Sequence, residues 1–145
     1  MPLDPSYKDL NRASTERIKK LTSSLTDEEM QIRVGAHWTV SIALIHIAFW
    51  ERRVIYILDA SAKGGKLIIP GIDICVNDLS LPLWAAIPAR EAAGMAIEAC
   101  QELDKRLEAY PQNLLEELHD LNKRFVIRAL HRNEHLDEVD AALKK

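Results

Sequence analysis

The sequence predicts an all-α protein, a four-helix bundle with a long crossover loop between the second and third helices. Apolar residues recur at helical spacing in four long regions, and prolines and glycines separate those regions. No segment of appreciable length alternates apolar and polar residues as a half-buried strand would. The 145 residues, of which 48% are hydrophobic and 28% charged, have the size and composition of one globular domain, 1–145.

The first helix is predicted over residues 5–25. Its apolar residues lie at roughly helical spacing: Tyr7, Leu10, Ala13, Ile18 and Leu21. Directly after it, Thr26 and Glu29 have the spacing of a capping box, in which each side chain accepts a hydrogen bond from the other residue's backbone N–H. We expect a short turn there before Gly35 breaks the chain.

The second helix is predicted to begin near Thr39, a suitable N-cap, and to end near residue 60. Its first half is apolar on nearly every side, which indicates a helix enclosed by others. The stretch 40–58 is the most hydrophobic of the chain, but charged residues at 51–53 interrupt it, and the apolar run before them is too short to cross a bilayer. We therefore expect a buried helix and no membrane span.

Residues 61–80 are predicted to form a loop, because they include Gly64-Gly65 and Pro70-Gly71. The loop is longer than a tight helix–helix connection needs. It can cross over, so that the second and third helices need not be antiparallel, or it can fold over one end of the bundle as a lid. Its short apolar runs allow a short strand in this segment, but the sequence has no pattern that predicts a hairpin there.

Two prolines offer starts for the third helix, because proline is accepted in the first helical turn. It is predicted to begin at Pro82 or Pro88, with a short turn before the main helix as one arrangement, and to end near Tyr110. The fourth helix is predicted from Pro111 to the C-terminus, with a break or bend near Asn122.

Composition excludes several classes of function. The formal net charge is only −3, and no Lys/Arg cluster is interleaved with aromatic residues, which argues against a nucleic-acid groove. The first residues have neither a basic nor an apolar region of a secretory signal, so a cytoplasmic protein is expected. The two cysteines, Cys75 and Cys100, are not in a CxxC spacing and are expected to be reduced thiols.

The sharpest local motif is the pair His131 and His135. Residues four apart lie on one face of a helix, so both imidazoles can reach one metal ion, although such a pair also occurs on solvated helix surfaces. With Glu134 between them, the pair matches the His-x-x-Glu-His pattern of metalloproteases with a glutamate base. That interpretation needs an acidic ligand well downstream, and only ten residues remain after His135. Glu134 is therefore either a neighbour of the site or an exposed helical residue.

A third ligand must come from upstream, and His46 is the strongest candidate. It lies in the nearly all-apolar part of the second predicted helix. A buried neutral histidine needs hydrogen-bond partners or a metal ion. A core histidine bonded to a backbone carbonyl or a neighbouring side chain is the alternative.

Residues 37–51 resemble the second-helix signature of the DinB/YfiT-like family: Trp38, Thr39, His46, Trp50 and Glu51. The C-terminal pair His131 and His135, followed by Leu136, resembles the other motif of that family, and Asn77 resembles an asparagine often found ahead of the third helix. With the chain length and the four predicted helices, the resemblance covers nearly the whole chain.

This resemblance implies one divalent metal ion held by His46, His131 and His135. Members of the family include thiol-dependent transferases and isomerases that use bacillithiol or mycothiol, and self-protection proteins that open strained electrophilic toxins. The expectation is a thiol transferase or hydrolase acting on a small electrophilic substrate, with Zn²⁺, Ni²⁺ or Fe²⁺ and a low-molecular-weight thiol as cofactors.

Further site residues are expected around this metal ion. Glu51 or Glu134 is expected to orient a histidine or move a proton, and Trp50 and Asn77 are expected in the pocket. The alternatives are a non-catalytic metal- or ligand-binding bundle and a bundle without metal. A homodimer is expected only because two-fold dimers are the commonest oligomers.

A helical wheel of the last helix raises one conflict. Its apolar stripe is predicted to consist of Phe125, Ala129, Leu136, Val139 and Leu143. His135 lies at the edge of that stripe and His131 further round, while Arg128 and Arg132 fall on or near it. Either the helix bends, or the site opens to a groove on the flank of the bundle.

Overall fold

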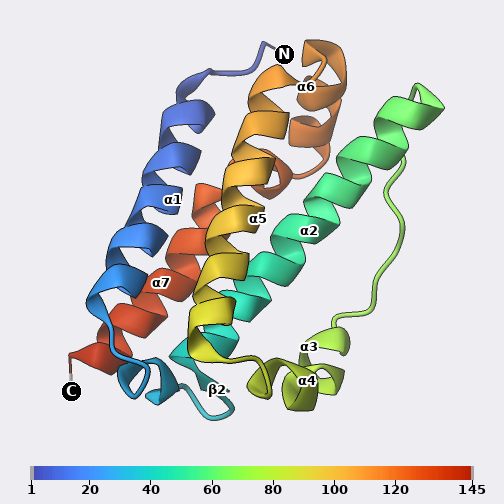
Figure 1. Ribbon diagram of the computed structural model, residues 1–145. Coiled ribbons are helices and arrows are strands. Elements are labelled where there is room, and N and C mark those ends of the chain that lie inside the picture. Colours follow the sequence, from blue (N-terminus) through green and yellow to red (C-terminus); the bar gives the residue numbers. More distant parts are fainter. Residues whose placement is uncertain (1, 145) are drawn as a thin grey trace.

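The computed structural model describes residues 2–144, which are mostly helical (Figure 1). These residues form seven α-helices, two 3-10 helices and one pair of two-residue strands. The long helices are α1 (Ser6–Ser24), α2 (Val40–Gly64), α5 (Ala89–Ala109) and α7 (Ala129–Leu143). The prediction of an all-α protein is confirmed, and the strand pair is its only departure within the described residues.

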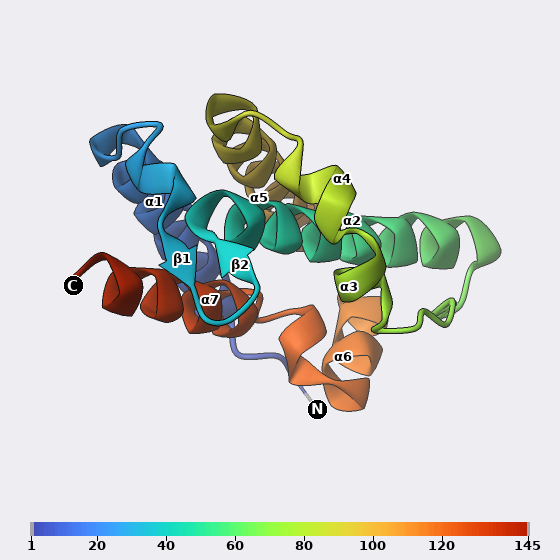
Figure 2. The same ribbon diagram turned by 90° about the horizontal axis from the view of Figure 1, so that it is seen from below.

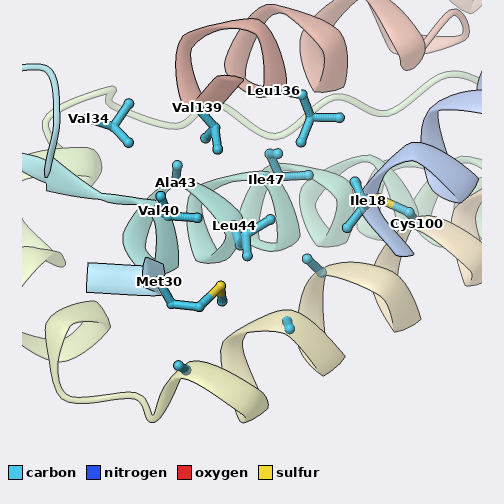
Figure 3. Close-up of a cluster of buried hydrophobic side chains, with 13 residues drawn as sticks. Ile18, Met30, Val34, Val40, Ala43, Leu44, Ile47, Cys100, Leu136 and Val139 are labelled. Atoms are coloured by element: carbon cyan, nitrogen blue, oxygen red, sulfur yellow. The ribbon is translucent and has the colours of Figure 1, made fainter. Parts of the chain in front are cut away.

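Each long helix packs against two of the others. α1 and α2 each contact both α5 and α7, so apolar side chains from all four meet between them. Figure 3 shows one resulting cluster, with these labelled members: Ile18, Met30, Val34, Val40, Ala43, Leu44, Ile47, Cys100, Leu136 and Val139. A second cluster lies toward the other end of α2 and includes Val54, Leu58, Leu103 and Leu118.

Helix α2 begins where the sequence predicts. The Thr39 hydroxyl accepts a hydrogen bond from the backbone N–H of Ile42 at 3.2 Å, so Thr39 is the N-cap. The helix continues four residues beyond the predicted end and stops at Gly64, because Gly65 takes a left-handed conformation with φ +70°. Of the helices in residues 2–144, none combines the length and apolar character needed to cross a membrane.

The segment between α1 and α2 contains a turn that the sequence predicts and a hairpin that it does not. The capping box is present: Glu29 Oε1 accepts from Thr26 N at 2.9 Å, and Thr26 Oγ1 accepts from Glu29 N at 3.1 Å. It starts the 3-10 helix η1 (Glu29–Gln31). Strands β1 (Arg33–Val34) and β2 (Trp38–Thr39) then pair antiparallel and lie against both α2 and α7 (Figure 2).

The segment between α2 and α5 has no strand, although its sequence allowed a short one. Figure 1 shows it returning from the end of α2 toward the start of α5. It includes the short helices α3 (Val76–Leu79) and α4 (Leu81–Ala85). Pro82 lies in the first turn of α4 and Pro88 is the N-cap of α5, so both prolines mark helix starts, as predicted.

The fourth predicted helix is two helices, because the break near Asn122 is complete. α6 (Gln112–Leu121) ends at Asn122, whose backbone is extended at φ −162° and ψ 111°. The 3-10 helix η2 (Lys123–Phe125) and three further residues precede α7. Phe125 therefore lies outside α7, and its predicted place in the apolar stripe of that helix was wrong. The direction in which the side chains of α7 point is not fixed by α6.

Candidate metal centre

The structure brings the three predicted histidines together. His46 comes from α2, and His131 and His135 lie one turn apart on α7. One nitrogen of each ring lies within 4.8 Å of those of the other two. The ring centroids of His135 are 4.5 Å from His46 and 4.7 Å from His131. These three residues, called the histidine cluster below, could hold a metal ion.

Burial keeps two of these histidines neutral. His46 is 5% exposed, and burial, followed by the neighbouring His135, lowers its pKa to about 3. Burial, followed by the charge of Arg128, lowers the pKa of His131 to about 2. At neutral pH both rings are therefore uncharged, and a neutral imidazole is the form that binds a metal ion.

The spacing of the nitrogens fits metal ligands. Nε2 of His46 and Nε2 of His131 are 3.3 Å apart. Two nitrogens that are each about 2.0–2.1 Å from one tetrahedral metal ion lie about 3.4 Å from each other. The same contact also has hydrogen-bond length, whereas His46 Nδ1 is buried without a hydrogen-bond partner among the described residues.

Glu138 orients the third histidine. Its Oε1 is 2.8 Å from Nδ1 of His135, one turn earlier on α7. A carboxylate in this position fixes the ring and leaves Nε2 of His135 free to bind a metal ion. Sequence reasoning missed Glu138, although its spacing of three residues from His135 on the same helix was a usable signal.

Aromatic rings surround the cluster. The centroid of Trp38, at the end of the hairpin, is 4.5 Å from that of His46 and 5.5 Å from that of His135. Trp50 and Trp84 lie 6.3 and 6.1 Å from His46. These rings lie against His46 and contribute to the burial that lowers its pKa.

The predicted pocket residues Trp50 and Asn77 are hydrogen-bonded to each other. Trp50 Nε1 donates a hydrogen bond to Asn77 Oδ1 at 3.0 Å, which ties α3 to α2. Asn77 also lies close enough to His46 to oppose part of the decrease in its pKa. The structure therefore places both residues beside the cluster.

Glu51 is buried in ion pairs. Arg128 donates from Nε and Nη2 to Glu51 Oε2 at 3.1 and 2.6 Å, and Arg132 donates from Nε and Nη2 to Glu51 Oε1 at 3.0 and 2.7 Å. Burial raises the pKa of this carboxyl, but the two guanidinium groups outweigh it and lower that pKa to about 2. Glu51 is linked to the cluster through Arg128, whose Nη2 is 3.4 Å from Nδ1 of His131.

The same ion pairs resolve the conflict on the helical wheel. Arg132 is fully buried and also lies 2.9 Å from Asp104 Oδ1 on α5. Its Nη1 donates to three oxygens of α1: Asn11 O, Ser14 Oγ and Thr15 Oγ1. Arg128 and Arg132 therefore face the core because their partners are there. Glu51, Asp104, Arg128 and Arg132 are called the buried charge network below.

Glu134 lies at the edge of the site and is exposed. Its Oε2 is 3.7 Å from His135 Nε2, and its Oε1 is 3.4 Å from Arg124 Nη2. Both predicted descriptions hold, since it is a helical surface residue and a neighbour of one histidine.

Two hollows reach the histidine cluster from different sides. A depression of about 790 Å³ lies between the hairpin and α7 and is lined by Val34, Trp38, His135 and Ala142, among others. A cleft of about 150 Å³ on the other side is lined by His131 and Trp50 together with arginines. Each hollow therefore includes one histidine of the cluster in its lining, His135 in the depression and His131 in the cleft.

Comparisons of the chain with protein-family models, with curated proteins and with solved structures found no match. The resemblance to the DinB/YfiT-like family therefore stays a prediction, and the chemistry of the site follows from its own geometry. Cys75 and Cys100 are both free thiols, as predicted; the first is exposed and the second is buried in the apolar cluster of Figure 3.

Proposed function

We propose that this chain is a metal-dependent enzyme of the DinB/YfiT-like type. It is a single four-helix bundle of α1, α2, α5 and α7, in which residues 65–88 form the crossover between α2 and α5. One divalent metal ion binds to His46, His131 and His135, and the reaction is a thiol transfer to, or a hydrolysis of, a small electrophilic substrate. The motifs support this proposal, and so does the placement of the three histidines, one on α2 and two on α7, which is what the resemblance implies.

The convergence of the three histidines is the observation that supports the proposal most. Three nitrogens within 4.8 Å, drawn from two helices and facing one another, form a ligand set for Zn²⁺, Ni²⁺ or Fe²⁺. Three protein ligands are the number found in catalytic zinc sites, which keep a position open, whereas structural sites have four.

The residues of the chain would each have a distinct task. A metal ion bound by three neutral imidazoles would lower the pKa of a coordinated water or thiol and so supply a nucleophile at neutral pH. Glu138 holds the ring of His135, and Trp38 covers His46 and His135 against solvent. Glu134 is exposed, and its Oε2 is 3.7 Å from His135 Nε2. This carboxylate would pass a proton between the site and solvent.

Metal analysis tests the proposal directly. The wild type, His46→Ala and His119→Ala are purified without chelator and their metal content is measured. His119 is the matched control, because it lies on α6 outside the cluster. We expect about one equivalent of metal in the wild type and in the control and almost none in His46→Ala. Equal metal content in all three proteins would refute the three-histidine site.

Turnover separates the enzyme from a binding module. The metal-loaded wild type is assayed with bacillithiol, mycothiol or glutathione and a chromogenic electrophile, and separately for hydrolysis of activated esters. Metal-dependent turnover that His131→Ala abolishes supports the enzyme. Full metal content without turnover in any of these assays would favour the alternative, a non-catalytic metal- or ligand-binding bundle.

A further inference from the structure

The small cleft beside His131 differs from the larger depression in its charge. Its lining residues are Trp50, Arg53, Val54, Asn122, Arg124, Phe125, Arg128 and His131. Three of the eight are arginines, and none is acidic. This cleft, called the basic cleft below, lies where α2 faces the break between α6 and α7.

Charges inside the molecule do not neutralise the whole of this cleft. In the buried charge network, two arginines face two carboxylates, so the network is balanced in itself. Arg128 is the one arginine of the cleft that belongs to the network, and Glu51 accepts its hydrogen bonds. The positive charges of Arg53 and Arg124 remain to be accounted for.

Arg53 has no carboxylate partner among residues 2–144. The only hydrogen bond of its guanidinium in this part of the chain goes from Nη2 to the backbone oxygen of Pro70 at 3.2 Å. Burial, followed by the charge of Arg128, lowers its pKa, as expected for a cation close to another cation. Most of its N–H donors are therefore free for a ligand.

Two aromatic rings hold the guanidinium of Arg53 in place. Its Cζ is 5.7 Å from the centroid of Trp50 and 5.6 Å from that of Phe125. Such cation–π contacts leave the edge of the guanidinium, with its N–H donors, as the part that can bind a ligand. A planar edge of this kind pairs with two oxygens of a carboxylate or phosphate at once.

Arg124 adds a second, weakly neutralised charge. Its nearest carboxylate is the exposed Glu134, at 3.4 Å from Nη2. An ion pair between two such exposed side chains contributes little, so it can be exchanged for a ligand at small cost.

From this arrangement we propose that the basic cleft binds the oxyanion group, carboxylate or phosphate, of a small-molecule ligand through Arg53 and Arg124. At about 150 Å³ the cleft is smaller than the ~300–1,000 Å³ of typical ligand pockets, so it takes one end of the ligand. Because His131 lines the same cleft, the rest of the ligand lies toward the histidine cluster. This placement of the ligand rests on the proposed function. It implies that the substrate of the enzyme, or its thiol cofactor, is anionic.

The test titrates the metal-free, ¹⁵N-labelled protein with succinate and, separately, with inorganic phosphate at constant ionic strength. Binding is followed through the Nε–Hε signals of the arginine side chains. We expect saturable shifts of the Arg53 and Arg124 signals, and tighter binding of succinate or of phosphate identifies the oxyanion. Shifts that grow linearly with either anion, without saturation, would overturn the proposal.

Substitutions assign the binding to this cleft. Arg53→Gln is expected to weaken binding by about tenfold or more, and Arg53→Lys, which keeps the charge but loses the planar edge, by less. The control is Arg52→Gln, the same change one residue earlier at an exposed position that does not line the cleft. Equal weakening by the Arg52 and Arg53 variants would show unspecific attraction and overturn the site. If Arg53→Gln does not fold, Arg124→Gln takes its place.

Metal content, measured on the same proteins, separates this inference from the proposed function. Saturable anion binding by a wild type that never retains metal would support the basic cleft and refute the metal enzyme. A wild type that retains metal but shows no saturable binding would refute the basic cleft alone.

Discussion

Replacing Glu51 by glutamine tests how much the buried charge network contributes to stability. The substitution keeps the size of the side chain but removes the charge that four N–H groups of Arg128 and Arg132 share. Asp104, which pairs with Arg132, would then be the only carboxylate left in the network, and Arg128 would lose its carboxylate partner. Removing one partner of a buried ion pair costs about 3–5 kcal/mol, because the other charge stays buried without compensation.

The pKa of Glu51 gives a second route to the same magnitude. A decrease from 4.5 to about 2 corresponds to about 3 kcal/mol, at about 1.4 kcal/mol per pH unit. Because the pKa is lower in the folded than in the unfolded chain, this stabilisation is complete above pH 4.5 and is lost as the pH falls toward about 2. The difference between wild type and Glu51→Gln should therefore be largest near pH 7 and shrink below pH 4.5.

Urea denaturation at pH 7 and at pH 3–4 measures both effects. The control is Glu98→Gln on α5, an exposed glutamate, which should change the free energy of unfolding by less than about 0.5 kcal/mol. A loss below about 1 kcal/mol for Glu51→Gln at pH 7 would refute the reasoning, as would a difference that does not depend on pH.

Three further outcomes are expected. Asn11→Ala should lower the free energy of unfolding by about 2 kcal/mol, because the buried amide donates to Val126 O and accepts from Ala129 N, both at 2.9 Å; urea denaturation measures it, and a change near zero would contradict it. Glu138→Gln should weaken metal binding about tenfold by releasing Nδ1 of His135, and a competition titration with a metal chelator would contradict this by giving an unchanged affinity. Chelation of the wild type should lower the melting temperature by several degrees, since a ligand at about 100 times its Kd adds about 2.7 kcal/mol; identical melting curves would exclude a tightly bound metal.

Local signals in the sequence predicted several helix and turn starts, because each signal depends on one or two neighbouring residues. Thr39 caps α2, Thr26 and Glu29 form the capping box, and Pro88 precedes α5, as their spacing indicated. The hairpin could not be found in this way. Each of its strands has two residues, too few for an alternating pattern, and tertiary contacts with α2 and α7 accompany it.

The histidine cluster was predicted from the spacing of His131 and His135 together with the resemblance to the DinB/YfiT-like family, whereas its surroundings could not be predicted. The partners of Arg132 come from α1, α2 and α5, residues far apart in the sequence that only the fold brings together. For that reason Arg128 and Arg132 looked out of place on an apolar stripe. The charge of the basic cleft depends in the same way on the fold, because Arg53 and Arg124 lie on different elements.

The two arginines of the buried charge network and two histidines of the histidine cluster form two parallel rows along α7 and its N-cap residue Arg128. Arg128 and Arg132 are four residues apart, as are His131 and His135, and the second row lies three residues after the first. At about 100° per residue, three residues place the two rows about 60° apart around the axis of α7. The ion pairs of the arginines with Glu51 therefore determine how α7 is rotated, and that rotation directs the histidines toward His46. In such a role, buried ion pairs specify one arrangement of a helix even where apolar residues would be as stable.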